Sequence, residues 1–149
     1  MKRFEATLAW QRGDQAFTDL RYSRAHRWRF DGGLDVPASS SPLSVPVPLS
    51  DPAAVDPEEA LVAAAASCHM LFFLSLAAAR GYVVDRYDDH AVGLLDGAAI
   101  TRIVLNPAIA FGGERQPDRV ALAELHHEAH ARCYIANSLK GDVVVKGFD

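Results

Sequence analysis

An uncharged stretch of twenty residues, 60–79, constrains this chain more than any other feature. Asp56, Pro57 and Glu59 precede it, in the positions of a helix N-cap, a first helical residue and a capping-box acid. Gly81 follows it in the position of a C-cap glycine. We therefore expect one long helix that is apolar on nearly every side, and such a helix must be surrounded by other groups.

The same stretch is long enough to cross a membrane, which is the first alternative to weigh. It is rich in alanine, its flanks lack a basic cluster, and the rest of the chain alternates like the strands of a soluble protein. The N-terminus carries no long apolar run of a secretory signal. We therefore expect no membrane partner, a cytoplasmic location, and one domain spanning residues 1–149. The net charge of −4 argues against nucleic acid as a partner.

The remaining segments predict an α+β fold, in which a β-meander precedes the long helix and further strands and a second helix follow it. The turn signal Asp31-Gly32-Gly33 indicates a hairpin, and several prolines between residues 37 and 57 indicate an extended loop. Asp88-Asp89 separates two expected half-strands. The expected strands are 3–10, 25–30, 34–37, two within 82–96, 100–111 and 143–145, and the later helices are 118–132 and 134–139.

The chain has two cysteines, Cys68 within the long helix and Cys133 near the end of the second helix. Without an export signal a reducing compartment is expected, where a thiol pair is more often catalytic than a static crosslink. The alternative is two small buried side chains that are inert. A reactive thiol needs a nearby cation, and the arginines at 21, 24, 27 and 29 are the obvious source.

Two further groups each allow more than one interpretation. Glu58 suits the first turn of the helix, but ten residues of helix span about 15 Å, so it cannot touch Cys68 along one straight helix. A joint role would need a bridging side chain, a broken helix or a partner chain. His126, His130 and Cys133 share one helix face and could bind zinc, or the histidines could be solvated. We predict no metal and no cofactor.

The stretches DPEEALVAAAASC and AHARCYIANSLKGDVVV resemble the two cysteine segments of the OsmC/Ohr family of bacterial thiol peroxidases. The N-terminal meander, with its arginines and glycine-rich turn, fits the same pattern. The resemblance covers nearly the whole chain. His69-Met70 stands where the family usually has an aromatic residue, and Tyr134 replaces a common proline, so a divergent member is expected.

The resemblance implies an OsmC-like fold assembled as an intertwined homodimer with central helices between curved sheets. It also implies that Cys68 is the peroxidatic thiol and Cys133 the resolving thiol. Glu58 matches the family's acid by its offset from the first cysteine. Counted back from the glycine-rich turn, Arg24 matches the family's arginine best, and Arg27 is second.

The function expected from this resemblance is a thiol-dependent peroxidase that reduces organic hydroperoxides. The oxidised pair would be reduced by an external dithiol of lipoyl or thioredoxin type. Apolar residues near Cys68, such as Phe72, would favour an organic substrate over hydrogen peroxide. The alternative is a non-enzymatic domain of the same fold that binds a small ligand or serves as a structural dimer.

Overall fold

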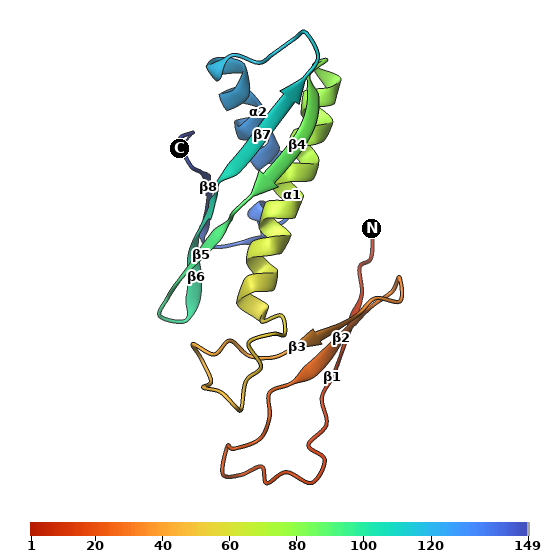
Figure 1. The fold of residues 1–149 in the computed structure, drawn as a ribbon, viewed down its shortest axis with the longest axis vertical. Helices are drawn as coiled ribbons and strands as arrows, with labels where there is room; N and C mark the ends of the chain where they lie inside the picture. Colours follow the sequence, from red (N-terminus) through yellow and green to blue (C-terminus); the bar gives the residue numbers. More distant parts are fainter. Residues whose placement is uncertain (149) are drawn as a thin grey trace. The chain divides into compact units, whose positions relative to one another are not determined.

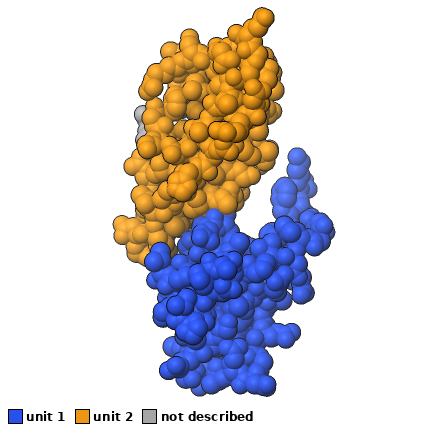
Figure 2. Space-filling view, in the orientation of Figure 1, with its two compact units in different colours: residues 1–60 blue, residues 61–149 orange. Residues whose placement is uncertain are grey.

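The computed structural model describes residues 1–148, and the chain forms two compact units, residues 1–60 and residues 61–149 (Figure 2). Helices and strands occupy separate stretches of the chain, so the expected α+β class is confirmed.

The first unit contains a three-stranded antiparallel sheet in the order β1-β2-β3. Its register places Leu8 opposite Trp28, and Trp28 opposite Val36. Gly33 has a φ of 88° in the turn after β2, which explains the glycine-rich hairpin signal. The first strand is shorter than expected from residues 3–10. The strands are β1 (Ala6–Ala9), β2 (His26–Phe30) and β3 (Asp35–Ala38).

The long helix α1 (Pro57–Ala79) begins and ends as its sequence predicts. The Asp56 carboxylate accepts a hydrogen bond from the Glu59 backbone N–H at 2.8 Å, which confirms the capping box. At the other end Gly81 has a φ of 77°, and the backbone N–H groups of Gly81 and Tyr82 donate to the carbonyls of Ala78 and Ala77. This pair of bonds is a Schellman motif, which satisfies the last helical carbonyls.

By length and composition, α1 could cross a membrane, because its most apolar window has a mean hydropathy of 2.0. Only 28% of that window is buried within the chain. The apolar helix is therefore less completely surrounded by its own chain than its composition demands.

The second unit holds two small sheets, two helical segments and most of α1. β4 pairs antiparallel with β7, and β5, β6 and β8 form a sheet in which β8 runs parallel to β6. The strand break in 82–96 falls at His90-Ala91, after Asp88-Asp89 rather than at it. The elements are β4 (Val83–Asp89), β5 (Val92–Asp96), β6 (Ala99–Leu105), β7 (Pro107–Gly112), α2 (Arg119–Arg132), the 3₁₀ helix η1 (Ala136–Ser138) and β8 (Asp142–Val145).

Two apolar clusters hold the second unit together. Phe73 and Leu76 of α1 pack with Leu125 of α2, and side chains of β4 and β7 cover this cluster. Figure 1 accordingly shows α1 and α2 on the same side of the β4–β7 pair. A second cluster joins Ala65 of α1 to Ile103 of β6 and the valines of β8. Both clusters use α1, so this helix is the element on which the unit is assembled.

Candidate functional site

The structure brings Cys68 and Cys133 together in the second unit. Cys68 lies near the middle of α1 and is half-buried, whereas Cys133 ends α2 as its C-cap residue and is 1% exposed. Both are free thiols, and their side chains lie within hydrogen-bonding range of each other. A disulfide needs two cysteines whose side chains face each other at close range, and the two thiols face each other here.

The surroundings of the two thiols make them unequal. The pKa of the Cys133 thiol is raised to about 11. Burial is the main cause and the neighbouring Cys68 thiol adds to it, whereas a backbone N–H of Ala136 favours the thiolate and opposes the rise. That N–H lies 3.4 Å from Cys133 Sγ. Cys133 is therefore a poor thiolate at neutral pH, and Cys68, which solvent reaches, is the better candidate nucleophile.

Two aromatic rings flank the thiols. Phe72 lies one helical turn after Cys68, and Tyr134 follows Cys133 directly. Their ring centroids are 5.2 Å apart in an edge-to-face arrangement, which is a favourable geometry for an aromatic pair. This pair places aromatic surface close along the chain to both cysteines.

A pair of buried histidines lies between the same two helices. His69 Nε2 and His126 Nδ1 are 3.1 Å apart, and the two side chains are 1% and 3% exposed. Their rings are nearly parallel, with centroids 5.4 Å apart. The pKa of both imidazoles is lowered to about 4, chiefly by burial, and for His69 the neighbouring His126 and His130 contribute to the shift. Both imidazoles are therefore neutral at physiological pH.

The direction of the hydrogen bond follows from the unused nitrogen of His69. His69 Nδ1 is buried and has no partner within residues 1–148. If His126 donated, the proton of neutral His69 would sit on Nδ1 as a buried N–H without an acceptor, which native structures rarely contain. If His69 Nε2–H donates, Nδ1 carries only a lone pair. The second arrangement costs less, so His69 is the donor and His126 the acceptor.

The sequence did not predict the histidine pair, which takes one ring nitrogen of His126 away from the zinc alternative. His126 faces the interior and its Nδ1 is taken by His69, whereas the sequence interpretation placed this histidine on a solvated or zinc-binding face. No group of three or more His, Cys, Asp or Glu side chains suited to a metal occurs among the described residues. The sequence signal that could have found it is His69, the one titratable imidazole in the uncharged stretch 60–79.

Arg24 belongs to the first unit, where hydrogen bonds fix its backbone on both sides. Its N–H donates to the Leu49 carbonyl at 2.8 Å, and its carbonyl lies 2.8 Å from His26 Nδ1. Trp28 Nε1–H can only donate, and it lies 2.8 Å from His26 Nε2. His26 therefore accepts at Nε2 and carries its proton at Nδ1, where it donates to Arg24.

The guanidinium of Arg24 is held inside its own loop. It donates to the carbonyls of Leu20 and Tyr22, and it stacks 3.8 Å above the Tyr22 ring. No ion pair within residues 1–148 includes Arg24 or Glu58, although Glu58 Oε2 is buried without a hydrogen-bond partner. The arginine is thus a cation that has not been neutralised by an acid.

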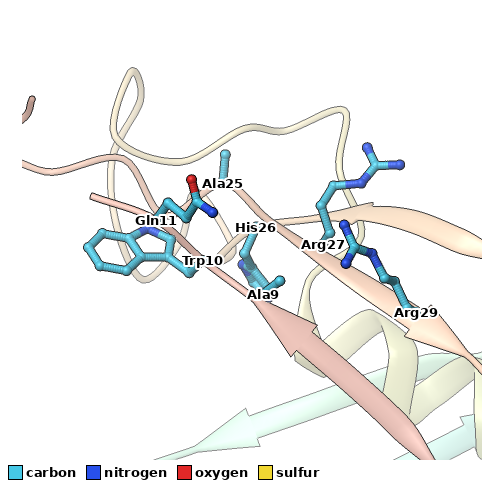
Figure 3. A pocket seen from close by; sticks show the side chains of 7 residues that line it. All are labelled: Ala9, Trp10, Gln11, Ala25, His26, Arg27 and Arg29. Atoms are coloured by element: carbon cyan, nitrogen blue, oxygen red, sulfur yellow. The ribbon is translucent and has the colours of Figure 1, made fainter. Parts of the chain in front are cut away.

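Arg27, the second candidate, is already paired. Its Nε lies 2.7 Å from the Asp35 carboxylate, and Arg29 contacts the other oxygen of that group at 3.1 Å. These contacts lower the pKa of Asp35, chiefly through the hydrogen bond from Arg27. Figure 3 shows Arg27 and Arg29 projecting from β2 beside an open pocket that Trp10 and His26 also line. Both arginines are exposed members of a surface ion pair network.

A second pocket of the first unit has an apolar lining and a volume of about 420 Å³. The rings of Trp10, Phe17 and Tyr22 form its wall and contact one another, the closest pair being Phe17 and Tyr22 at 4.7 Å. Arg24 and the hydroxyl of Ser40 supply polar groups, and the buried Ser40 hydroxyl has no hydrogen-bond partner among residues 1–148. This volume lies within the range of small-molecule sites.

The chain belongs to the OsmC-like protein family, whose sequence model matches residues 50–146. An OsmC-like protein of unknown function from Vibrio cholerae is 50% identical, with a TM-score of 0.95 over 98% of this chain and 99% of that chain. The OsmC-like fold expected from the sequence is therefore confirmed. Among proteins with curated descriptions, none matches.

Two more distant structures share the fold alone. An organic hydroperoxide resistance protein OsmC from Legionella pneumophila is 16% identical, with a TM-score of 0.67 over 98% of this chain and 95% of that one. The organic hydroperoxide resistance protein of Bacillus subtilis is 19% identical, with a TM-score of 0.58 over 97% and 96%. Proteins named for organic hydroperoxide resistance thus share the fold of this chain.

The buried histidine pair predicts a loss of stability in acid. The pKa of each imidazole falls from 6.5 to about 4 on folding. The stability that depends on neutral imidazoles is therefore fully present above pH 6.5 and is lost as the pH falls through 4. The loss approaches roughly 3 kcal/mol per histidine, at about 1.4 kcal/mol per pKa unit. Chemical unfolding of the wild type at pH 7 and again at pH 4.5 to 5, about two units lower, measures most of this loss in the free energy of unfolding.

The matched variant for this measurement is His69→Gln/His126→Asn, which keeps a donor and an acceptor but removes both titrating rings. Its free energy of unfolding should fall less between the two pH values than that of the wild type. His127 is exposed, so His127→Gln should retain the wild-type dependence. Equal acid dependence in the wild type and the double variant would contradict the assignment.

Proposed function

We propose that this protein is a cysteine-based peroxidase that reduces organic hydroperoxides. The observation that supports it most is the contact between a half-exposed Cys68 and a buried Cys133. Membership of a family that includes proteins named for organic hydroperoxide resistance supports the same reaction class. The two thiols differ in exposure, as the two steps of such a reaction require.

In the first step the Cys68 thiolate attacks the distal oxygen of ROOH. A sulfur–oxygen bond forms, the oxygen–oxygen bond breaks, and RO⁻ takes up a proton and leaves as ROH, so that Cys68 becomes a sulfenic acid. In the second step the sulfur of Cys133 displaces the hydroxyl of that sulfenic acid. A disulfide forms and the hydroxyl leaves with the proton of Cys133 as water. An external dithiol, of lipoyl or thioredoxin type, reduces the disulfide by exchange.

Arg24 is the cation proposed to stabilise the Cys68 thiolate and the developing charge on the peroxide. Arginine stays charged at any working pH and presents several N–H donors. Two observations favour Arg24 over Arg27: its guanidinium has no carboxylate partner in residues 1–148, and Arg27 is held by Asp35. Glu58, whose Oε2 is buried and unpartnered, is the acid proposed to orient the arginine during turnover.

The assembly proposed for this activity is a homodimer of one-domain chains in the cytoplasm. Five of the exposed residues of α1 recur every three or four positions, so they form a stripe of small and apolar side chains on one helical face. Leu71 within this stripe is 60% exposed. A second copy of the chain would bury it. The stripe consists of Ala64, Ser67, Leu71, Ser75 and Ala78.

A second candidate function is binding of a small ligand without catalysis. The aromatic pocket around Trp10, Phe17 and Tyr22 favours it, because the pocket is apolar and large enough for an organic molecule. In that case neither thiol would be oxidised by a stoichiometric amount of hydroperoxide.

The roles of the two cysteines predict different losses of activity. Cys68→Ser should abolish consumption of an organic hydroperoxide such as cumene hydroperoxide, because no nucleophile remains. Cys133→Ser should complete one reduction per chain, because Cys68 is intact. Its steady-state turnover should then be slower by on the order of a hundredfold, because no internal thiol resolves the sulfenic acid. A hydroperoxide assay with dihydrolipoamide, and in parallel with reduced thioredoxin, measures both. Full turnover by Cys68→Ser would exclude the proposed reaction.

The assignment of Arg24 is tested against Arg27 as a matched control. Arg24→Ala should slow peroxide reduction by about 10²- to 10³-fold, the usual loss when a transition-state donor is removed. It should also slow alkylation of Cys68 by iodoacetamide at pH 7, because less thiolate is present. Arg27→Ala should change both rates little. If only the Arg27 variant is slow, Arg27 and not Arg24 is the arginine that acts on the Cys68 thiolate.

The proposed dimer predicts a molar mass of twice the 16.2 kDa chain in solution. Light scattering at micromolar concentration measures this mass. Leu71→Glu places a charge on the exposed face of α1 and should yield monomers. Leu95 is 55% exposed on β5, so Leu95→Glu provides a control that should remain dimeric. A wild type that is monomeric under these conditions would rule out the dimer.

A further inference from the structure

We propose that His69 and His126, through their hydrogen bond, keep Cys68 opposite Cys133 so that the disulfide between the two cysteines can form. The inference rests on the proposed function only in assigning a use to that disulfide. His69 and His126 are positioning residues, because they act on the thiols through the placement of the two helices.

The histidine contact and the cysteine contact lie close to each other along both helices. His69 follows Cys68 directly on α1. On α2, His126 lies about two turns before Cys133, and residues two turns apart share one helix face. The imidazole contact and the thiol contact therefore connect the same two helices along neighbouring lines. A change of helix register at the histidines is carried to the thiols.

The apolar surroundings of the histidine pair leave His126 as the acceptor for the Nε2–H of His69, because water cannot take its place. The Phe73 ring lies 4.6 Å from the His126 ring, and Phe148 lies 4.9 Å from it on the C-terminal segment. The histidine rings are almost fully buried, so water does not compete for the Nε2–H of His69. Sliding α1 against α2 would leave that N–H without an acceptor in an apolar site, which disfavours every other register.

The chemistry of Cys133 explains why such precision is needed. Its thiol is buried and protonated at neutral pH, so little thiolate is available to attack a sulfenic sulfur. The reaction then depends on a high local concentration of one thiol at the other. Disulfide geometry is narrow, with a Cβ–Cβ distance of roughly 3.5–4.5 Å, so a small shift of one helix removes this advantage.

The test is the equilibrium of the Cys68–Cys133 dithiol with glutathione, which requires no peroxidase activity. In this exchange the dithiol loses two hydrogens to glutathione disulfide and two molecules of glutathione form. Acid quenching, alkylation and intact-mass measurement give the equilibrium constant at pH 7. His126→Leu removes the acceptor at similar size and should lower the constant by at least about tenfold.

Two further variants separate positioning from general loss of stability. His69→Gln/His126→Asn restores a donor at the place of Nε2 and an acceptor at the place of Nδ1, and should return the constant to within about threefold of the wild type. Leu122→Ala loosens the packing of α2 about three turns from Cys133, and should lower stability with little effect on the constant. If His126→Leu does not unfold cooperatively, His69→Met takes its place, because methionine fills irregular apolar space.

An unchanged equilibrium constant in His126→Leu would overturn the proposal. A His69→Gln/His126→Asn variant that folds but does not regain the wild-type equilibrium constant would also overturn it. The proposed function fails separately: a wild type that does not consume hydroperoxide, with variants that shift the glutathione equilibrium as expected, would leave the positioning role standing. Normal hydroperoxide consumption by the wild type with an unchanged constant in His126→Leu would reject the positioning role alone.

Discussion

The packing of α1 against α2 determines where the reactive groups of this protein lie. Phe73 and Leu76 meet Leu125 in an apolar cluster, and this contact sets the two thiols against each other across the helix pair. Because α1 is apolar on nearly all sides, its position is set by what covers it rather than by polar contacts along its length. One face is covered by α2 and the small sheets, and the exposed stripe on another face is the surface that we assign to a second copy.

The first unit contributes a cation whose backbone is fixed and whose side chain is held only by neutral groups. The hydrogen bonds from His26 and to Leu49 hold the backbone of Arg24, while its guanidinium is bound by carbonyls and one aromatic ring. Neutral partners leave the positive charge of Arg24 uncompensated, whereas Arg27 is engaged by the Asp35 carboxylate that it shares with Arg29. This contrast is the physical reason for assigning the thiolate's partner to the less exposed of the two arginines.

Most elements could be predicted from the sequence because their ends carry local signals. The capping box at Asp56 and the glycine after α1 act within a few residues, so α1 was predicted to within a residue or two. The histidine pair could not be predicted in this way, because His69 and His126 meet only through tertiary packing. For the same reason the sequence alone indicates only a solvated or zinc-binding role for His126 and His130. The contact between the cysteines was expected from the family resemblance, since no local pattern brings two distant thiols together.

The central claim is that Cys68 reacts with a hydroperoxide and that Cys133 resolves the product. Intact-mass spectrometry of the wild type after one equivalent of an organic hydroperoxide, with no reductant present, tests this most directly. The account predicts the loss of two hydrogens per chain and a disulfide-linked peptide pair that contains Cys68 and Cys133. A chain that gains oxygen on the peptide holding Cys68, with Cys133 still free to alkylate, would contradict the resolving role. A chain of unchanged mass would contradict the peroxidase activity itself.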